Sequence, residues 1–201
     1  IARLIKGTSE FGKELDSLTD FVSFGIAPAF ILYFWELKNY GKIGWAITLI
    51  FSVCCVLRLA RFNLTKISEE AEWKRNYFEG VPSPAGAILI LLPLIYELSE
   101  IQLDFDIIKF TPYLVIIVAV LLISNIPTFS LKKIKISSQL TIFLLFGIIV
   151  IFVSLIFFTF KALLVLGLLY LLSIPVSYFL YKKTNKKLSK ILNEEDHEDI
   201  L

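Results

Sequence analysis

Long uncharged stretches alternate along the chain with short segments that carry most of its charged residues. Because a helix needs about 20 residues to cross roughly 30 Å of hydrocarbon, stretches near this length predict membrane spans. Six stretches qualify, at residues 21–35, 43–57, 80–96, 110–131, 136–160 and 162–181. The last three are long enough alone, whereas the first and second need to extend back to about Ser9 and on to about Asn63. The pattern predicts an all-α fold, a polytopic transmembrane bundle of six helices.

The composition is that of a membrane protein. Apolar residues make up 57% of the 201 residues, charged residues make up 19%, and the mean hydropathy of +0.77 is too high for a soluble domain. The lipid bilayer is therefore an expected partner. A net charge of +2 is not that of a nucleic-acid-binding protein, so no nucleic acid is expected.

The chain is expected to form one membrane domain over residues 1–190 and a disordered acidic tail over 191–201. The single histidine, His197, lies in that tail, which excludes histidine-based catalysis and His-ligated zinc sites from the domain. Cys54 and Cys55 are adjacent in an apolar run and are expected to be reduced. The chain contains no methionine and is expected to be a fragment.

The basic residues predict the orientation of the bundle. With a cytoplasmic N-terminus, only four of the 20 Lys and Arg residues fall outside, namely Lys38, Lys42, Lys109 and Lys161. The positive-inside rule selects this topology for a cell membrane protein. Residues 64–78 between the second and third spans, which include Trp73, are expected to lie on the cytoplasmic surface as an interfacial segment.

Gly12, Asp16 and Asp20 are four residues apart, so a helix would place all three on one face. Acidic residues also favour the first turns of a helix, where they complement its dipole, but Asp20 lies too far along the helix for that explanation. Two carboxylates at this spacing repel each other unless a cation lies between them. Hard oxygen ligands suit Mg²⁺, Mn²⁺ or Ca²⁺.

Arg58 and Arg61 lie three residues apart at the cytoplasmic end of the second predicted span, and Asn63 follows. One interpretation is anchoring, in which both arginines extend to lipid phosphates. The alternative is a shared stripe that faces the aspartates and binds a carboxylate or a phosphate, for which the guanidinium fork is well shaped.

The N-terminal spacing resembles a known signature. Ala2-Arg3, eight residues, Gly12, three residues, Asp16, three residues and Asp20 match the second half of the signature of the CDP-alcohol phosphatidyltransferase family. In that family the pattern Asp-x-x-Asp-Gly-x-x-Ala-Arg comes first, and most of it is absent here. The intact protein would therefore have about eight spans.

Three further segments are similar to the phosphatidylserine synthase branch of this family, and the resemblance covers residues 1 to about 87. They are Ser-Phe-Gly-Ile-Ala-Pro-Ala at 23–29, Leu-Arg-Leu-Ala-Arg-Phe-Asn at 57–63 and Phe-Glu-Gly-Val-Pro-Ser-Pro-Ala-Gly-Ala at 78–87. Within the first segment, Gly25 and Pro28 predict a bend in the helix that carries the aspartates.

The resemblance implies transfer of a phosphatidyl group from CDP-diacylglycerol to L-serine by a homodimer with two divalent cations, Mg or Mn, at each site. It implies that Asp16 and Asp20 are metal ligands and that Asp20 takes the proton of the serine hydroxyl. Arg3, Gly12 and Ser9 would contact the CDP diphosphate.

Arg58, Arg61 and Asn63 are candidates for the serine carboxylate or a lipid phosphate. Two alternatives remain at this point. The acceptor could be another alcohol, of the glycerol phosphate or inositol type. The chain could also be a small ion-coupled transporter, in which intramembrane Asp and Arg line a pathway.

Overall fold

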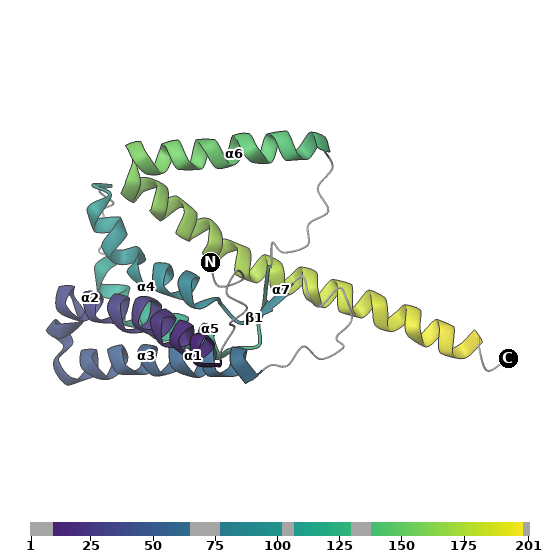
Figure 1. Cartoon of the computed structure of the whole chain (residues 1–201), viewed down its shortest axis with the longest axis horizontal. Helices are drawn as coiled ribbons and strands as arrows, with labels where there is room; N and C mark the ends of the chain where they lie inside the picture. Colours follow the sequence, from purple (N-terminus) through teal and green to yellow (C-terminus); the bar gives the residue numbers. More distant parts are fainter. Residues whose placement is uncertain (1–9, 65–76, 102–106, 130–137, 199–201) are drawn as a thin grey trace.

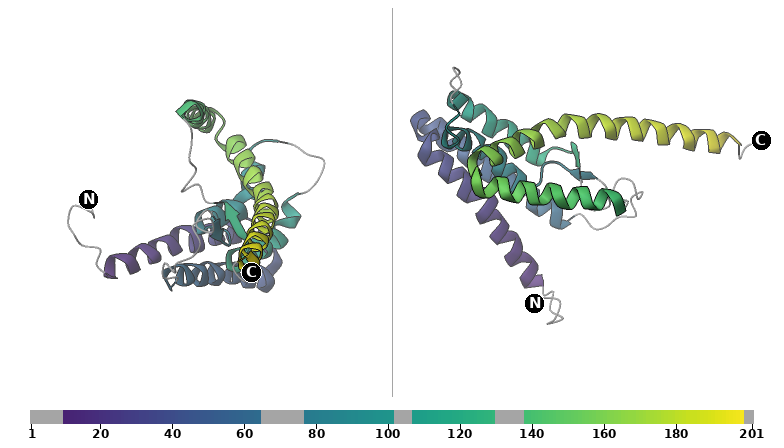
Figure 2. Two further views of the ribbon diagram at one scale, coloured as in Figure 1. Left: turned by 90° about the vertical axis from the view of Figure 1, so that its right-hand side faces the viewer. Right: turned by 90° about the horizontal axis from the view of Figure 1, so that it is seen from above.

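The computed structural model describes residues 10–64, 77–101, 107–129 and 138–198. Its first part is a long helix in three sections, α1 (Glu10–Phe21), the π-helical η1 (Val22–Ile26) and α2 (Ala27–Trp35). The remaining elements are the 3₁₀ helix η2 (Leu37–Tyr40), α3 (Gly41–Leu64), β1 (Tyr77–Glu79), α4 (Ser83–Leu98), the 3₁₀ helix η4 (Ile107–Phe110), α5 (Thr111–Ile123), β2 (Pro127–Phe129), α6 (Ser138–Phe157) and α7 (Thr159–Glu198). Helices α1 to α5 form one group, α7 crosses it, and α6 stands apart (Figures 1 and 2).

Each predicted span coincides with an apolar helix, which confirms the all-α membrane fold. Three helical stretches of the described chain are long and apolar enough to cross a membrane, namely Phe11–Trp35, Leu37–Asn63 and Thr159–Lys182. The first two include the polar extensions that the sequence predicts. Shorter apolar helices cover Ser83–Leu98, Ile107–Ile123 and Phe143–Phe157.

The fourth span is shorter than predicted. The uncharged stretch continues to residue 131, but α5 ends at Ile123 because Ser124 adopts an extended conformation (ψ 156°). The chain then forms β2, which pairs antiparallel with β1 in the register Tyr77↔Phe129 and Glu79↔Pro127. Hydropathy alone cannot detect this change of backbone conformation, since a buried strand and a helix are equally apolar.

The predicted interfacial segment overlaps two described elements at its ends. Its residue 64 ends α3, and residues 77 and 78 belong to β1. Residues 65–76, including Trp73, lie outside the described residues.

The helix that carries the aspartates departs from α geometry where the sequence predicts a bend. Pro28 has no N–H to donate to Phe24, and the N–H of Ala27 bonds Val22 O, five residues back. Gly25 is buried at this irregular turn. A Cβ added there would lie 3.1 Å from Cys55 Sγ, so the glycine permits close contact with α3.

The core lies between α2, α3, α4 and α5, with α7 packed over it. Phe51, Leu32, Leu89 and Ile90 are fully buried, and Val118 is 1% exposed. In contrast, α6 exposes large apolar side chains, which fits a helix that faces lipid.

Helix α7 also includes most of the predicted C-terminal tail. Helix α7 continues without interruption through residues 191–198 to Glu198. The residues after the last span are mainly Lys, Leu, Asn and Glu, and most of these types have high helix propensity, which extends a helix already started by the span.

Candidate functional site

Helix α1 presents the predicted acidic face. Because Glu10–Phe21 is regular α-helix, Gly12, Asp16 and Asp20 lie one above another on it. Gly12 and Asp16 are exposed, and Asp20 is half-buried at the point where α1 enters the bundle. Arg3 and Ser9 lie outside the described residues.

The C-terminal end of α3 holds α1 in place through Asn63. Asn63 Nδ2 donates to Ser17 Oγ at 2.8 Å, next to Asp16 in sequence. Lys13 Nζ donates to the backbone oxygen of Asn63 at 3.5 Å. Asn63, which the sequence offers as a substrate ligand, thus contacts the helix that carries the aspartates.

Arg58 lies inside the bundle. Its side chain is half-buried, and Nε donates to the backbone oxygen of Val81. Nη1 donates to Ser83 Oγ at 3.3 Å. Anchoring to lipid headgroups therefore does not describe Arg58, because its guanidinium contacts the loop that precedes α4.

Arg61 contacts a different element. Its Nη1 donates to the backbone oxygen of Ile123 at 3.2 Å, and the side chain is exposed. Ile123 is the last residue of α5, where unpaired carbonyls and the helix dipole carry partial negative charge. The arginine pair thus links α3 to the start of α4 and the end of α5.

The loop contacted by Arg58 depends on Gly80. This residue has φ +71°, a conformation that side-chain-bearing residues rarely adopt. Its N–H donates to Ile126 O at 2.9 Å, and Thr128 Oγ1 donates to its carbonyl oxygen at 2.8 Å. A Cβ at this position would lie 2.7 Å from Ser124 O.

Two side chains that sequence reasoning missed belong to the same region. Cys55 of α3 is buried near both Asp20 and Arg58. Tyr170 of α7 interacts electrostatically with Arg58. The sequence feature that could have pointed to Tyr170 is its hydroxyl group within an otherwise apolar span, because a buried tyrosine hydroxyl usually needs a hydrogen-bond partner.

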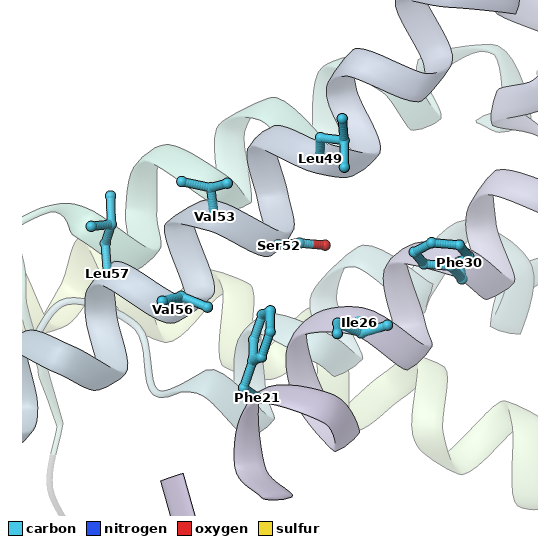
Figure 3. A pocket seen from close by; sticks show the side chains of 8 residues that line it. All are labelled: Phe21, Ile26, Phe30, Leu49, Ser52, Val53, Val56 and Leu57. Carbon is cyan, nitrogen blue, oxygen red and sulfur yellow. The ribbon is translucent and has the colours of Figure 1, made fainter. Parts of the chain in front are cut away.

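An apolar hollow of about 320 Å³ lies between α1–α2 and α3 (Figure 3). One end begins at Phe21 and Leu57, the sequence neighbours of Asp20 and Arg58. The lining residues are Phe21, Ile26, Phe30, Leu49, Ser52, Val53, Val56 and Leu57.

The donor set suits a divalent cation only in part. No three Asp, Glu, His or Cys side chains gather into a metal-binding group within the residues that the structure describes. Asp16 and Asp20 do supply carboxylate oxygens from one helix face. Magnesium is commonly held by one or two carboxylates together with water and substrate phosphates, so the pair fits that mode of binding.

Comparison with known proteins identifies the family. The family model described as CDP-alcohol phosphatidyltransferase matches residues 1–171. A CDP-diacylglycerol–serine O-phosphatidyltransferase of Helicobacter pylori is 36% identical over 157 residues, 78% of this chain and 62% of that protein. A protein of the same name from Mycobacterium bovis is 35% identical over 128 residues, which are 63% of this chain and 44% of that protein. Another from Bacillus subtilis is 38% identical over 97 residues, which are 48% of this chain and 51% of that protein.

The chain thus spans less than two thirds of the length of these relatives. The family match, however, covers both the acidic face of α1 and the arginine pair of α3. The chain belongs to the CDP-alcohol phosphatidyltransferase family.

Proposed function

We propose that the protein transfers a phosphatidyl group from CDP-diacylglycerol to the hydroxyl of L-serine and releases CMP. The observation that carries this proposal is the contact between α1, which bears the two aspartates, and the end of α3 that bears the two arginines, where Asn63 Nδ2 donates to Ser17 Oγ at 2.8 Å. The names of the relatives support serine as the acceptor.

In the proposed reaction, the serine hydroxyl oxygen forms a bond to the phosphorus next to the diacylglycerol, and the bond from that phosphorus to the CMP oxygen breaks. Asp20 accepts the hydroxyl proton. Its half-buried position at the entry to the bundle suits a base that must be near both water and lipid. CMP leaves with the electron pair of the broken bond.

Two divalent cations, Mg or Mn, are part of the proposal. Asp16 and Asp20 would hold them, and bound cations would supply charge neutralisation on the diphosphate. Gly12, exposed on the same face, leaves space for the nucleotide, with Arg3 and Ser9 as the further proposed contacts.

Arg58, Arg61 and Asn63 are proposed to act at the other side of the site. Arg58 uses two of its five N–H donors, one on Val81 of the loop before α4 and one on Ser83 at the start of α4, so its guanidinium can still bind a carboxylate or a phosphate. Arg61 and Asn63 would act mainly by holding α5 and α1 around this position.

The proposed setting is the cell membrane, with the site facing the cytoplasm and the protein acting as a homodimer. The excess of basic residues on one side supports this orientation. The apolar hollow beside Phe21 and Leu57 offers a surface for an acyl chain of the lipid donor. The exposed apolar face of α6, with Phe143 77% exposed, is available to lipid or to a second copy.

The test is an assay of the full-length protein in lipid–detergent micelles, with CDP-diacylglycerol and labelled L-serine. We expect labelled phosphatidylserine and CMP in equal amounts, and little product with glycerol 3-phosphate or inositol. Asp20→Asn is the control for background. Product from another acceptor alone would change the assigned substrate, and absence of CMP release with all acceptors would overturn the proposed chemistry.

A further inference from the structure

The hydroxyl of Tyr170 is buried without a hydrogen-bond partner among the residues that the structure describes. Thr128 and Arg58 lie close enough to interact with it. Thr128 cannot donate to it, however, because its only hydroxyl proton is given to Gly80 O at 2.8 Å. A buried hydroxyl in this situation is costly unless another group completes the hydrogen bond.

A second unpartnered hydroxyl lies on the same face of α7. Ser177 is fully buried and its Oγ has no partner in the described chain. Seven residues separate it from Tyr170, which is two helical turns, so both project from one side of the helix. Helix α7 packs against β2, the strand that contains Thr128 (Figure 1). The face of α7 that carries Tyr170 and Ser177 is therefore polar, although a buried helix face in a membrane bundle is expected to be apolar.

We propose that the Tyr170 hydroxyl and the Arg58 guanidinium together bind the carboxylate of the acceptor amino acid. This inference rests on the proposed function and names the subsite that makes serine the preferred acceptor. A carboxylate accepts several hydrogen bonds, which both a guanidinium and a phenol can donate. It would complete the hydrogen bonding of the otherwise unpaired tyrosine.

The position of the pair relative to Asp20 suits this acceptor. Cys55 lies within electrostatic range of both Arg58 and Asp20, and it contacts the helix of Asp20 at Gly25. Serine has only two carbon atoms between its carboxylate carbon and its hydroxyl oxygen. A carboxylate held at Arg58 and Tyr170 would keep the hydroxyl on the side of the site where the proposed base lies.

The depth of the tyrosine favours the acceptor over the lipid donor. Its hydroxyl is buried, Thr128 of β2 and Arg58 of α3 lie near it, and Arg58 in turn donates to the backbone oxygen of Val81. A diphosphate attached to two acyl chains must remain at the lipid-facing side of the bundle, whereas a small free amino acid can enter an enclosed polar site.

The test is Tyr170→Phe in the full-length protein, which removes only the hydroxyl. We expect the KM for serine to rise about 10- to 100-fold, the range for loss of one hydrogen bond to a charged group. The KM for CDP-diacylglycerol should stay within about twofold. Tyr178→Phe is the matched control, because Tyr178 lies on the same helix with 43% of its surface exposed, and it should change neither constant.

Two further measurements separate substrate binding from a structural role. The unfolding temperature of Tyr170→Phe should equal or exceed that of the wild type, because an unsatisfied hydroxyl is removed. Ethanolamine is serine without its carboxylate, so the preference for serine over ethanolamine in kcat/KM should fall by the same factor as the serine KM rises.

Several outcomes would overturn the inference. A lower unfolding temperature with an unchanged serine KM would make Tyr170 a structural residue. A rise in the KM of CDP-diacylglycerol alone would assign the subsite to a donor phosphate. Unchanged kinetics with an active wild type would reject this subsite only, whereas a wild type that does not use serine would reject the proposed function as well.

Discussion

Replacement of Gly80 by alanine should weaken both the fold and the site. The residue has φ +71°, a left-handed conformation that costs an alanine about 1–2 kcal/mol. The added Cβ would also lie 2.7 Å from Ser124 O, closer than Cβ atoms approach other atoms in proteins, and 3.0 Å from Leu122 O, a tight contact. Overpacking against backbone of this kind costs about 1–3 kcal/mol. The expected loss of unfolding free energy is therefore about 2–5 kcal/mol.

The assay is unfolding in mixed micelles of increasing SDS content, followed by tryptophan fluorescence. Gly147→Ala is the matched control, because Gly147 lies in a helix with nothing within 4 Å of an added Cβ. That variant should be neutral or up to about 1 kcal/mol more stable, since alanine favours the helix. The same methyl group thus has opposite expected effects at the two positions.

Gly80→Ala should also lower activity per folded molecule. The adjacent Val81 oxygen and Ser83 hold Arg58, so a displaced loop would move the guanidinium. A loss of stability below about 0.5 kcal/mol in Gly80→Ala, or equal effects at Gly80 and Gly147, would refute the reasoning about this loop.

Three other predictions concern the site and the topology. Asp16→Asn should raise the Mg²⁺ or Mn²⁺ concentration needed for half-maximal activity. Asp20→Asn should lower kcat by about 10²–10⁴-fold while CDP-diacylglycerol binding is retained. Full activity in either variant would exclude the assigned role of that carboxylate. Arg61→Lys should lower stability by about 0.3–1 kcal/mol in chemical unfolding with little change in serine KM, and a hundredfold rise in that KM would instead make Arg61 a substrate ligand. Lys42→Cys and Lys182→Cys, each in a protein without the native cysteines, test the orientation with a membrane-impermeant thiol reagent. The reagent should label Lys42→Cys from outside the cell and Lys182→Cys only after permeabilisation, and the reverse pattern would contradict the predicted orientation.

Features that depend on local periodicity could be predicted from the sequence. The spacing of Gly12, Asp16 and Asp20 places them on one face of any α-helix, and α1 confirms this. The apolar stretches predict the helices because the cost of exposing backbone polar groups in lipid leaves few other conformations. Pro28 predicts an irregular turn for an equally local reason, the missing N–H.

Features that depend on contacts between distant segments were decided only by the tertiary structure. The sequence leaves open whether Arg58 reaches lipid or the bundle interior, and its partners are 23 and 25 residues away. Ser124 ends α5 early because the strand pair β1–β2 and Gly80 provide backbone partners that hydropathy does not encode.

The proximity of Tyr170 to Arg58 is likewise decided by tertiary packing. The sequence shows a tyrosine hydroxyl within an apolar span, but the residues near that hydroxyl are decided only when α7 packs over β2. Helix formation is governed by interactions a few residues apart, so a single sequence carries the information for it. The polar site is assembled by packing between helices far apart in the chain, and that packing depends on the shape and burial of all of them at once.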